Sequence, residues 1–185
     1  MRSMKEGTFI RTFRTRDDRT VILRVLKWSD LDDFLQFINS LVDEGADILV
    51  NTKKTREEEI DFVSRILSSV EKDRMVSVVA EVDGRLIGHV EVVKKQGYSS
   101  HVGILGISII QGYRGIGIGQ ELMLEAEAQA KRLGVELIEL DVYERNKCAI
   151  HVYKKTGYKS IGKISKDIKR EDRYLDTLIM LKELK

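Results

Sequence analysis

The chain has 185 residues, of which 42% are hydrophobic, and a formal net charge of +2, so a single domain with a full core is expected. The near-neutral charge argues against a nucleic-acid partner, and the absence of any apolar run near the roughly 18 residues of a membrane span argues against a membrane segment. One cysteine, Cys148, excludes an internal disulfide and favours a reducing, cytoplasmic location.

The first 70 residues predict a hairpin followed by two helices. Residues 8–14 and 20–26 are β-rich and flank a polar turn. Ser29 with Asp32 and Thr55 with Glu58 have the spacing of capping boxes, which predicts helices ending near residues 43 and 70 with a loop at 44–54. We predict that residues 1–19 form an N-terminal extension that could contribute one extra strand, and that residues 20–185 form a single domain.

The remaining chain alternates between strands and helices. Asp83-Gly84 between residues 75–82 and 85–94 is a strong hairpin signal, and a strand follows at 101–110. A helix to about 133, a strand at 135–143 and a short helix at 149–155 come next. Two strands, 158–164 and 173–182, are joined by a basic polar connection. The order ββααβββαβαββ predicts a mixed α/β layer protein without the steady alternation of a doubly wound sheet.

Residues 111–119 read Gln-Gly-Tyr-Arg-Gly-Ile-Gly-Ile-Gly, between a β-branched strand and an amphipathic helix. Glycines let the backbone approach a ligand, and the free N–H groups of a helix start favour phosphate. The turn therefore predicts a pyrophosphate site. A dinucleotide fold would place its glycines early with a later acidic residue, and a P-loop would end in Gly-Lys-Ser/Thr, whereas Gln120 and Glu121 follow here.

Two blocks in this region resemble a known family. Arg114-x-x-Gly117-x-Gly119 is similar to the acetyl-CoA signature of the GNAT family of N-acetyltransferases. Residues 140–158, with Asn146 and Tyr153 at matching positions, resemble its second conserved block, and the ribosomal-protein N-acetyltransferase branch is the nearest in pattern. The resemblance implies the acyl-CoA N-acyltransferase fold, with a mostly antiparallel mixed sheet and helices on both faces.

The resemblance also implies the ligands. Acetyl-CoA would be the acetyl donor, no metal would be needed, and the acceptor would be a primary amine on a protein N-terminus, a lysine, a polyamine or another small molecule. Whether the protein forms a homodimer is left open by the sequence. The positions matched to cofactor binding are Ile107, Ser108, Ile109, Arg114, Gly115, Ile116, Gly117, Ile118, Gly119, Gln120, Asn146 and Tyr153.

Tyr153 is implied as the acid that protonates the departing thiolate, since a phenol is a fit donor to a thiolate. The general base is less clear. The position matched to the glutamate of the histone-modifying branch is Gly103, which has no side chain. Asp141 matches the glutamate of the ribosomal-protein branch and is one methylene shorter. Glu91 and His101 are further candidates, and catalysis by positioning alone also stays open.

Other features have plainer interpretations. Cys148 lacks an evident His and acid partner, so a covalent nucleophile is not expected. Acids at 43, 44 and 47 could attract a cationic amine, although solvated loop acids are the commoner case. Four arginines, Arg11, Arg14, Arg16 and Arg19, could bind an anion, although a solvated hairpin tip is favoured. A non-catalytic acetyl-CoA sensor on the same fold is the alternative function, and Tyr153 argues against it.

Overall fold

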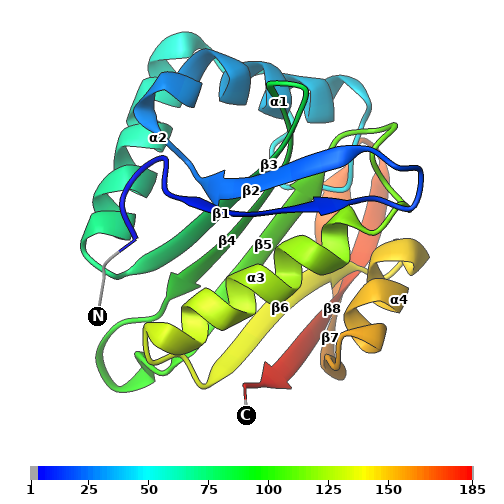
Figure 1. Ribbon diagram of the computed structural model, residues 1–185. Coiled ribbons are helices and arrows are strands. Elements are labelled where there is room, and N and C mark those ends of the chain that lie inside the picture. Colours follow the sequence, from blue (N-terminus) through cyan, green and yellow to red (C-terminus); the bar gives the residue numbers. More distant parts are fainter. Residues whose placement is uncertain (1–3, 185) are drawn as a thin grey trace.

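The computed structural model describes residues 4–184 and contains one eight-stranded sheet in the order β1-β2-β3-β4-β5-β6-β8-β7 (Figure 1). Every neighbouring pair is antiparallel except β5 and β6. The strands are β1 (Phe9–Arg14), β2 (Thr20–Val25), β3 (Met75–Val82), β4 (Arg85–Lys94), β5 (Val102–Ile109), β6 (Leu137–Tyr143), β7 (Lys159–Arg170) and β8 (Arg173–Glu183). The helices are α1 (Leu31–Asp43), α2 (Arg56–Glu71), α3 (Ile118–Arg132) and α4 (Lys147–Lys155). This order confirms the predicted sequence of elements.

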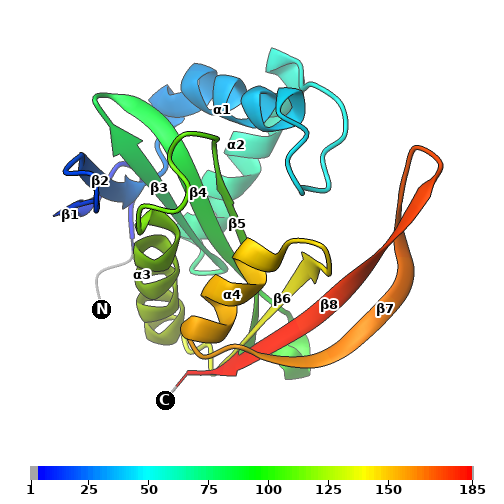
Figure 2. The same cartoon turned by 90° about the vertical axis from the view of Figure 1, so that its right-hand side faces the viewer.

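Helices cover both faces of the sheet (Figure 2). Side chains alternate between faces along a strand, so β4 sends Val90 and Val92 to one side and His89 and Glu91 to the other. Leu122 of α3 approaches Gly88, which places α3 on the side of the valines. The ring of Phe34 in α1 lies 5.0 Å from that of His89, which places α1 on the opposite side.

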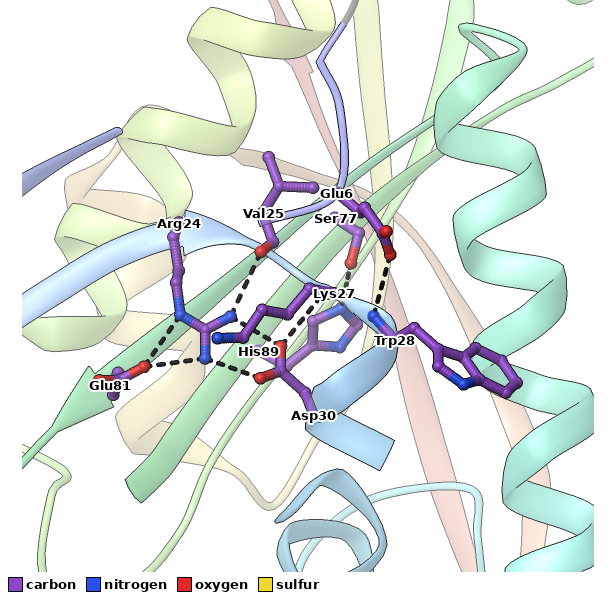
Figure 3. Close-up of polar contacts among 9 residues, drawn as sticks. All are labelled: Glu6, Arg24, Val25, Lys27, Trp28, Asp30, Ser77, Glu81 and His89. Carbon is purple, nitrogen blue, oxygen red and sulfur yellow. Dashed lines mark hydrogen bonds and ion pairs between the residues drawn. The ribbon is translucent and has the colours of Figure 1, made fainter. Parts of the chain in front are cut away.

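The start of α1 differs from the prediction. Ser29 does not cap the helix. A 3-10 turn, Trp28–Asp30, precedes α1, and the carboxylate of Asp30 accepts the backbone N–H of Lys27 at 2.9 Å. Asp30 also accepts two hydrogen bonds from the guanidinium of Arg24, which pairs in addition with Glu81 (Figure 3). This buried ion pair between Arg24 and Asp30 is hydrogen-bonded on several sides, and it fixes the position of the start of α1 relative to the sheet.

The C-terminal hairpin is longer than predicted. The basic connection expected after residue 164 is instead a continuation of β7 to Arg170, and a tight turn at Glu171, with φ of 54°, leads into β8. The hairpin extends from the body and curves toward the loop between α1 and α2 (Figure 2). There the guanidinium of Arg170 donates to the carbonyl of Gly45. The polar composition of 165–170 reflects an exposed edge strand rather than a loop.

Candidate active site

The edge of β5 is only partly paired. The register between β5 and β6 ends at Ile104 opposite Glu139, although both strands continue. The carbonyl of Val102 and the N–H of Ile110 form hydrogen bonds on the β4 side of the strand. The main-chain groups of alternate residues point to the same edge of a strand, so the even-numbered residues between these two also point toward β4. The groups of Ile107 and Ile109 therefore point to the unpartnered edge. The N–H of Ser108 faces β4, so of these three predicted positions only two can meet a ligand there through the backbone.

The glycine turn after β5 ends in a helix start with free donors. Gly115 and Gly117 have φ of 76° and 105°, a region that a side chain would strain. Gly117 is the N-cap of α3, and the first intrahelical bond runs from Glu121 N–H to its carbonyl. The N–H groups of residues 118–120 precede that bond, so they have no helical acceptor. This turn has the composition and geometry of an anion site.

Arg114 links the turn to the loop between α1 and α2. Its Nε donates to the carbonyl of Ile109 at 2.7 Å, and its guanidinium pairs with Glu44. Glu44 also accepts the backbone N–H of Gln111 at 2.9 Å. One carboxylate therefore connects the loop that follows α1 to the turn that precedes α3.

The second predicted block brings Asn146 and Tyr153 onto α4, directly after β6. The Oδ1 of Asn146 accepts the N–H of Ala149 at 3.1 Å, so Asn146 is the N-cap, and its Nδ2 is left for other partners. Tyr153 is 8% exposed, and burial raises the pKa of its hydroxyl to about 12. Within residues 4–184 that hydroxyl has no hydrogen-bond partner. It is a protonated donor across the physiological pH range.

Glu91 lies on the α1 and α2 face of the sheet, opposite Gly106 of β5. A Cβ at Gly106 would be in van der Waals contact with Glu91, 3.5 Å from its Oε1, so the glycine places no side chain against the carboxylate. Oε2 of Glu91 is buried and has no hydrogen-bond partner within residues 4–184. Burial raises the pKa of Glu91, and the charge of Arg65 partly opposes that rise. An unpartnered carboxylate with a raised pKa suits a general base near neutral pH.

The other base candidates lie in different environments. The side chain of Asp141 is largely exposed. Its pKa is raised by the partial loss of solvent around the carboxylate and by the charges of Glu139 and Asp167, while the charge of Lys95 opposes the rise. It shares a face with Glu139 and Tyr143, as the period of two predicts.

Gly103 and His101 are poorly placed. A Cβ at Gly103 would lie 2.5 Å from Val92, which is on the α3 face, so no side chain at this position could reach the face of Glu91. His101 precedes the first residue of β5, at the end remote from the glycine turn. A strand rise of about 3.3 Å per residue puts its Cα roughly 20 Å from that of Ile107. His101 therefore lies far along β5 from the glycine turn, which disfavours it as the base.

His89 is a polar group that the sequence reading missed. It shares the face of Glu91, and its Nε2 lies 2.9 Å from the hydroxyl of Ser77. Burial lowers the pKa of His89 to about 4, so the ring is neutral. The sequence could have indicated this position, because residues 89 and 91 are two apart on one predicted strand and so share a face.

The acids at the end of α1 and in the loop that follows it all have cationic partners, which weakens the idea that they attract an amine. The pairs are Asp43 with Lys53, Glu44 with Arg114, and Asp47 with Arg145 and Arg170. The loop is held further by Tyr143, whose hydroxyl donates to the carbonyl of Ile48 at 3.1 Å. These contacts fix the loop beside the unpartnered edge of β5.

Within residues 4–184, no three His, Cys, Asp or Glu side chains are grouped so as to hold a metal ion. No helix in the same part of the chain has the length and hydrophobicity to cross a bilayer.

Comparison with known proteins identifies the family to which the chain is similar. The acetyltransferase (GNAT) family matches residues 38–158. The L-amino acid N-acetyltransferase AaaT of Escherichia coli (strain K12) is 35% identical over 105 residues, which cover 56% of this chain and 65% of that protein. The chain thus aligns with just under two thirds of that relative's length.

Solved structures are similar over most of the chain. A GNAT-family acetyltransferase from Streptococcus pneumoniae superposes with a TM-score of 0.80 and 26% identity, covering 88% of this chain and 99% of that one. The yncA protein from Salmonella typhimurium, solved with its cofactor acetyl-CoA, has a TM-score of 0.78 and 15% identity, covering 89% of this chain and 94% of that one. At that identity the second likeness concerns the fold alone.

Proposed function

Because the chain belongs to the acetyltransferase (GNAT) family, we propose that it transfers an acetyl group from acetyl-CoA directly to a primary amine. The observation that carries this proposal is the unpartnered edge of β5 running into the glycine turn and the start of α3. An extended arm can pair with such an edge while a pyrophosphate occupies the helix start. No covalent enzyme intermediate is needed.

In this proposal the donor is held mainly by backbone. The N–H groups of residues 115–120 bind the pyrophosphate, and the guanidinium of Arg114 beside it offsets the charge of Glu44, with which it pairs. The pantetheine arm pairs with the edge at 107–109, and an N–H there stabilises the thioester oxygen as it becomes negative. Asn146 contributes its free Nδ2 to the arm.

The proton transfers belong to two side chains. The amine nitrogen attacks the thioester carbon, and Glu91 takes the proton that the nitrogen releases. The carbon–sulfur bond then breaks, and Tyr153 donates its proton to the departing thiolate. Glu91 is favoured over Asp141 because its carboxylate is buried and unpartnered, whereas Asp141 is exposed. Each transfer contributes about 10²- to 10⁴-fold to the rate in comparable enzymes.

For the acceptor we favour a free amino acid. The charge of Arg65 on α2 influences the pKa of Glu91, so the α1 and α2 face carries a guanidinium as well as a carboxylate. That arrangement complements the ammonium and carboxylate of one amino acid. The E. coli relative named as an L-amino acid N-acetyltransferase supports the same choice.

An acceptor panel tests the proposal. Acetyl-CoA is incubated with the protein and a free amino acid, its amide, a short peptide or a polyamine, and thiol release and acetylated product are measured. Amine-dependent release, fastest with the free amino acid, is expected. Binding of acetyl-CoA without any acetylated product would instead support the sensor alternative, and preference for the peptide or polyamine would change the acceptor class.

A further inference from the structure

The turn between β1 and β2 forms part of the wall around the glycine turn. The N–H of Arg16 donates to the carbonyl of Ile116 at 3.2 Å, and the guanidinium of Arg19 lies 4.7 Å from the ring centroid of Tyr113. Thr15 and Arg19 close the hairpin through a backbone bond of 2.9 Å. Figure 1 shows this tip beside the start of α3. The turn is therefore fixed next to the proposed pyrophosphate site.

The four arginines of this hairpin differ in one respect. Three of them pair with carboxylates: Arg11 with Glu121 at 2.7 Å, Arg14 with Asp18 at 2.6 Å and Arg19 with Asp17 at 2.5 Å. Arg16 is exposed and has no ion pair or side-chain hydrogen bond within residues 4–184. It is also the residue whose backbone touches the glycine turn. Its charge is available at the place where an anionic ligand would arrive.

Coenzyme A carries a third phosphate, on the 3′ position of its ribose, beyond the pyrophosphate. If the pantetheine arm lies along β5, the adenosine must leave the glycine turn on its outer side. The turn at 15–19 bonds to Ile116 of the glycine turn, and the start of α4 carries a second exposed cation, Lys147. Arginine is the better phosphate ligand, because its planar guanidinium can donate two parallel hydrogen bonds.

We propose that Arg16 binds the 3′-phosphate of coenzyme A and makes the protein distinguish coenzyme A from its 3′-dephospho form. This rests on the proposed function, since it needs the pyrophosphate at the glycine turn. The hairpin that precedes the first helix is then part of the donor site, and it holds Arg16 in place through the backbone bond to Ile116.

Calorimetric titrations with coenzyme A and 3′-dephospho-coenzyme A test this in four proteins: wild type, Arg16→Gln, Arg14→Gln and Lys147→Gln. Wild type is expected to bind coenzyme A about tenfold more tightly than the dephospho form, as one exposed charge-assisted contact provides. Arg16→Gln should bring that ratio close to one while leaving the affinity for the dephospho form unchanged. Arg14→Gln, in the same hairpin but paired with Asp18, should keep the wild-type ratio.

The outcomes separate this proposal from the proposed function. Tight binding of both ligands with no preference in wild type, or an unchanged preference in Arg16→Gln, overturns the role of Arg16 and leaves acetyl-CoA binding intact. Loss of the preference in Lys147→Gln alone moves the 3′-phosphate to α4 and also overturns it. Absence of binding by either ligand overturns the proposed function and this inference together. Equal thermal midpoints for the four proteins serve as the folding control.

Discussion

The donor side and the acceptor side of the proposed site are built in different ways. The donor side, from β5 through the start of α3, offers mostly main-chain groups: an unpaired strand edge, glycines with positive φ and a free helix start. The acceptor side, formed by α1, α2, their loop and the hairpin of β7 and β8, depends on side-chain ion pairs that join distant segments. A common cofactor can be recognised by backbone, whereas acceptor choice depends on side chains that can vary.

The largest effect should come from a charge placed on the donor side. Gly119 does not require a positive φ, and a Cβ there meets only the flexible end of Ile109 at 3.3 Å, so Gly119→Glu should fold. Its carboxylate would face the pyrophosphate, and like charges at an interface cost several kcal/mol. We expect acetyl-CoA affinity to fall at least about 100-fold by calorimetry. Gly119→Ala is the control and should bind nearly as wild type, and binding retained in Gly119→Glu would place the cofactor elsewhere.

Loss of the proposed acid should affect turnover and spare binding. Tyr153→Phe should lower kcat by about 10²- to 10⁴-fold, because it removes a proton donor used only as the thiolate leaves. The dissociation constant for acetyl-CoA should stay within about twofold of wild type. The wild-type rate should show no decline from this group until the pH approaches its pKa of about 12. Wild-type kcat in the variant would leave Tyr153 as a packing residue.

The proposed base should set the acidic limb of the pH–rate profile. Glu91 acts when ionised, so kcat should rise with pH through its pKa, which burial raises above the usual range. Glu91→Gln should flatten that limb and lower kcat by about 10²-fold or more at neutral pH. Asp141→Asn is the matched control on the exposed carboxylate. A flattened profile in Asp141→Asn and not in Glu91→Gln would reverse the assignment.

The same raised pKa affects stability. A carboxyl whose pKa is higher in the folded than in the unfolded protein holds its proton longer in the fold, so it makes stability fall as the pH rises through the folded pKa. Glu91→Gln removes an ionised group that is buried without a partner. The variant should therefore have a thermal midpoint at or above that of wild type at pH 7 and lose this advantage at acid pH. A lower midpoint at pH 7 would show that the carboxylate has a stabilising partner.

The smallest effect should be confined to the acceptor side. Arg65→Gln should raise the KM for a free amino acid by about tenfold, the value of one charge-assisted contact, and leave the KM for the corresponding amide nearly unchanged. The dissociation constant for acetyl-CoA should not move. Equal increases for the amino acid and its amide would mean that Arg65 does not contact a carboxylate.

How much could be predicted from the sequence follows the same division. The hairpin at Asp83-Gly84 and the capping box at Thr55 were local patterns, and the structure confirms both; it also places the glycine turn between β5 and α3. The predicted start of α1 was wrong because Asp30, and not Ser29, provides the local hydrogen bond there. The carboxylate of Asp30 accepts the Lys27 N–H and is held in place by a tertiary contact with Arg24. The length of β7 was missed because an exposed edge strand with many lysines has the composition of a loop.

The candidate site shows the same limit. The period of two correctly placed Asp141 with Tyr143, but it could not say which carboxylate is buried without a partner, because that depends on Gly106 across the strand pair. The pairing of Glu44 with Arg114 joins residues 70 positions apart in sequence, so no local pattern could show it. The proposed roles of the backbone follow from local sequence patterns, whereas the long-range ion pairs do not.

Amide hydrogen exchange with and without acetyl-CoA tests whether the backbone from β5 to α3 holds the donor, because it measures main-chain groups. Acetyl-CoA should slow exchange at the amides of residues 107, 109 and 115–120, with little change in the loop at 44–54 or in the hairpin of β7 and β8. Protection concentrated in that loop and hairpin, with none between residues 105 and 120, would contradict this prediction.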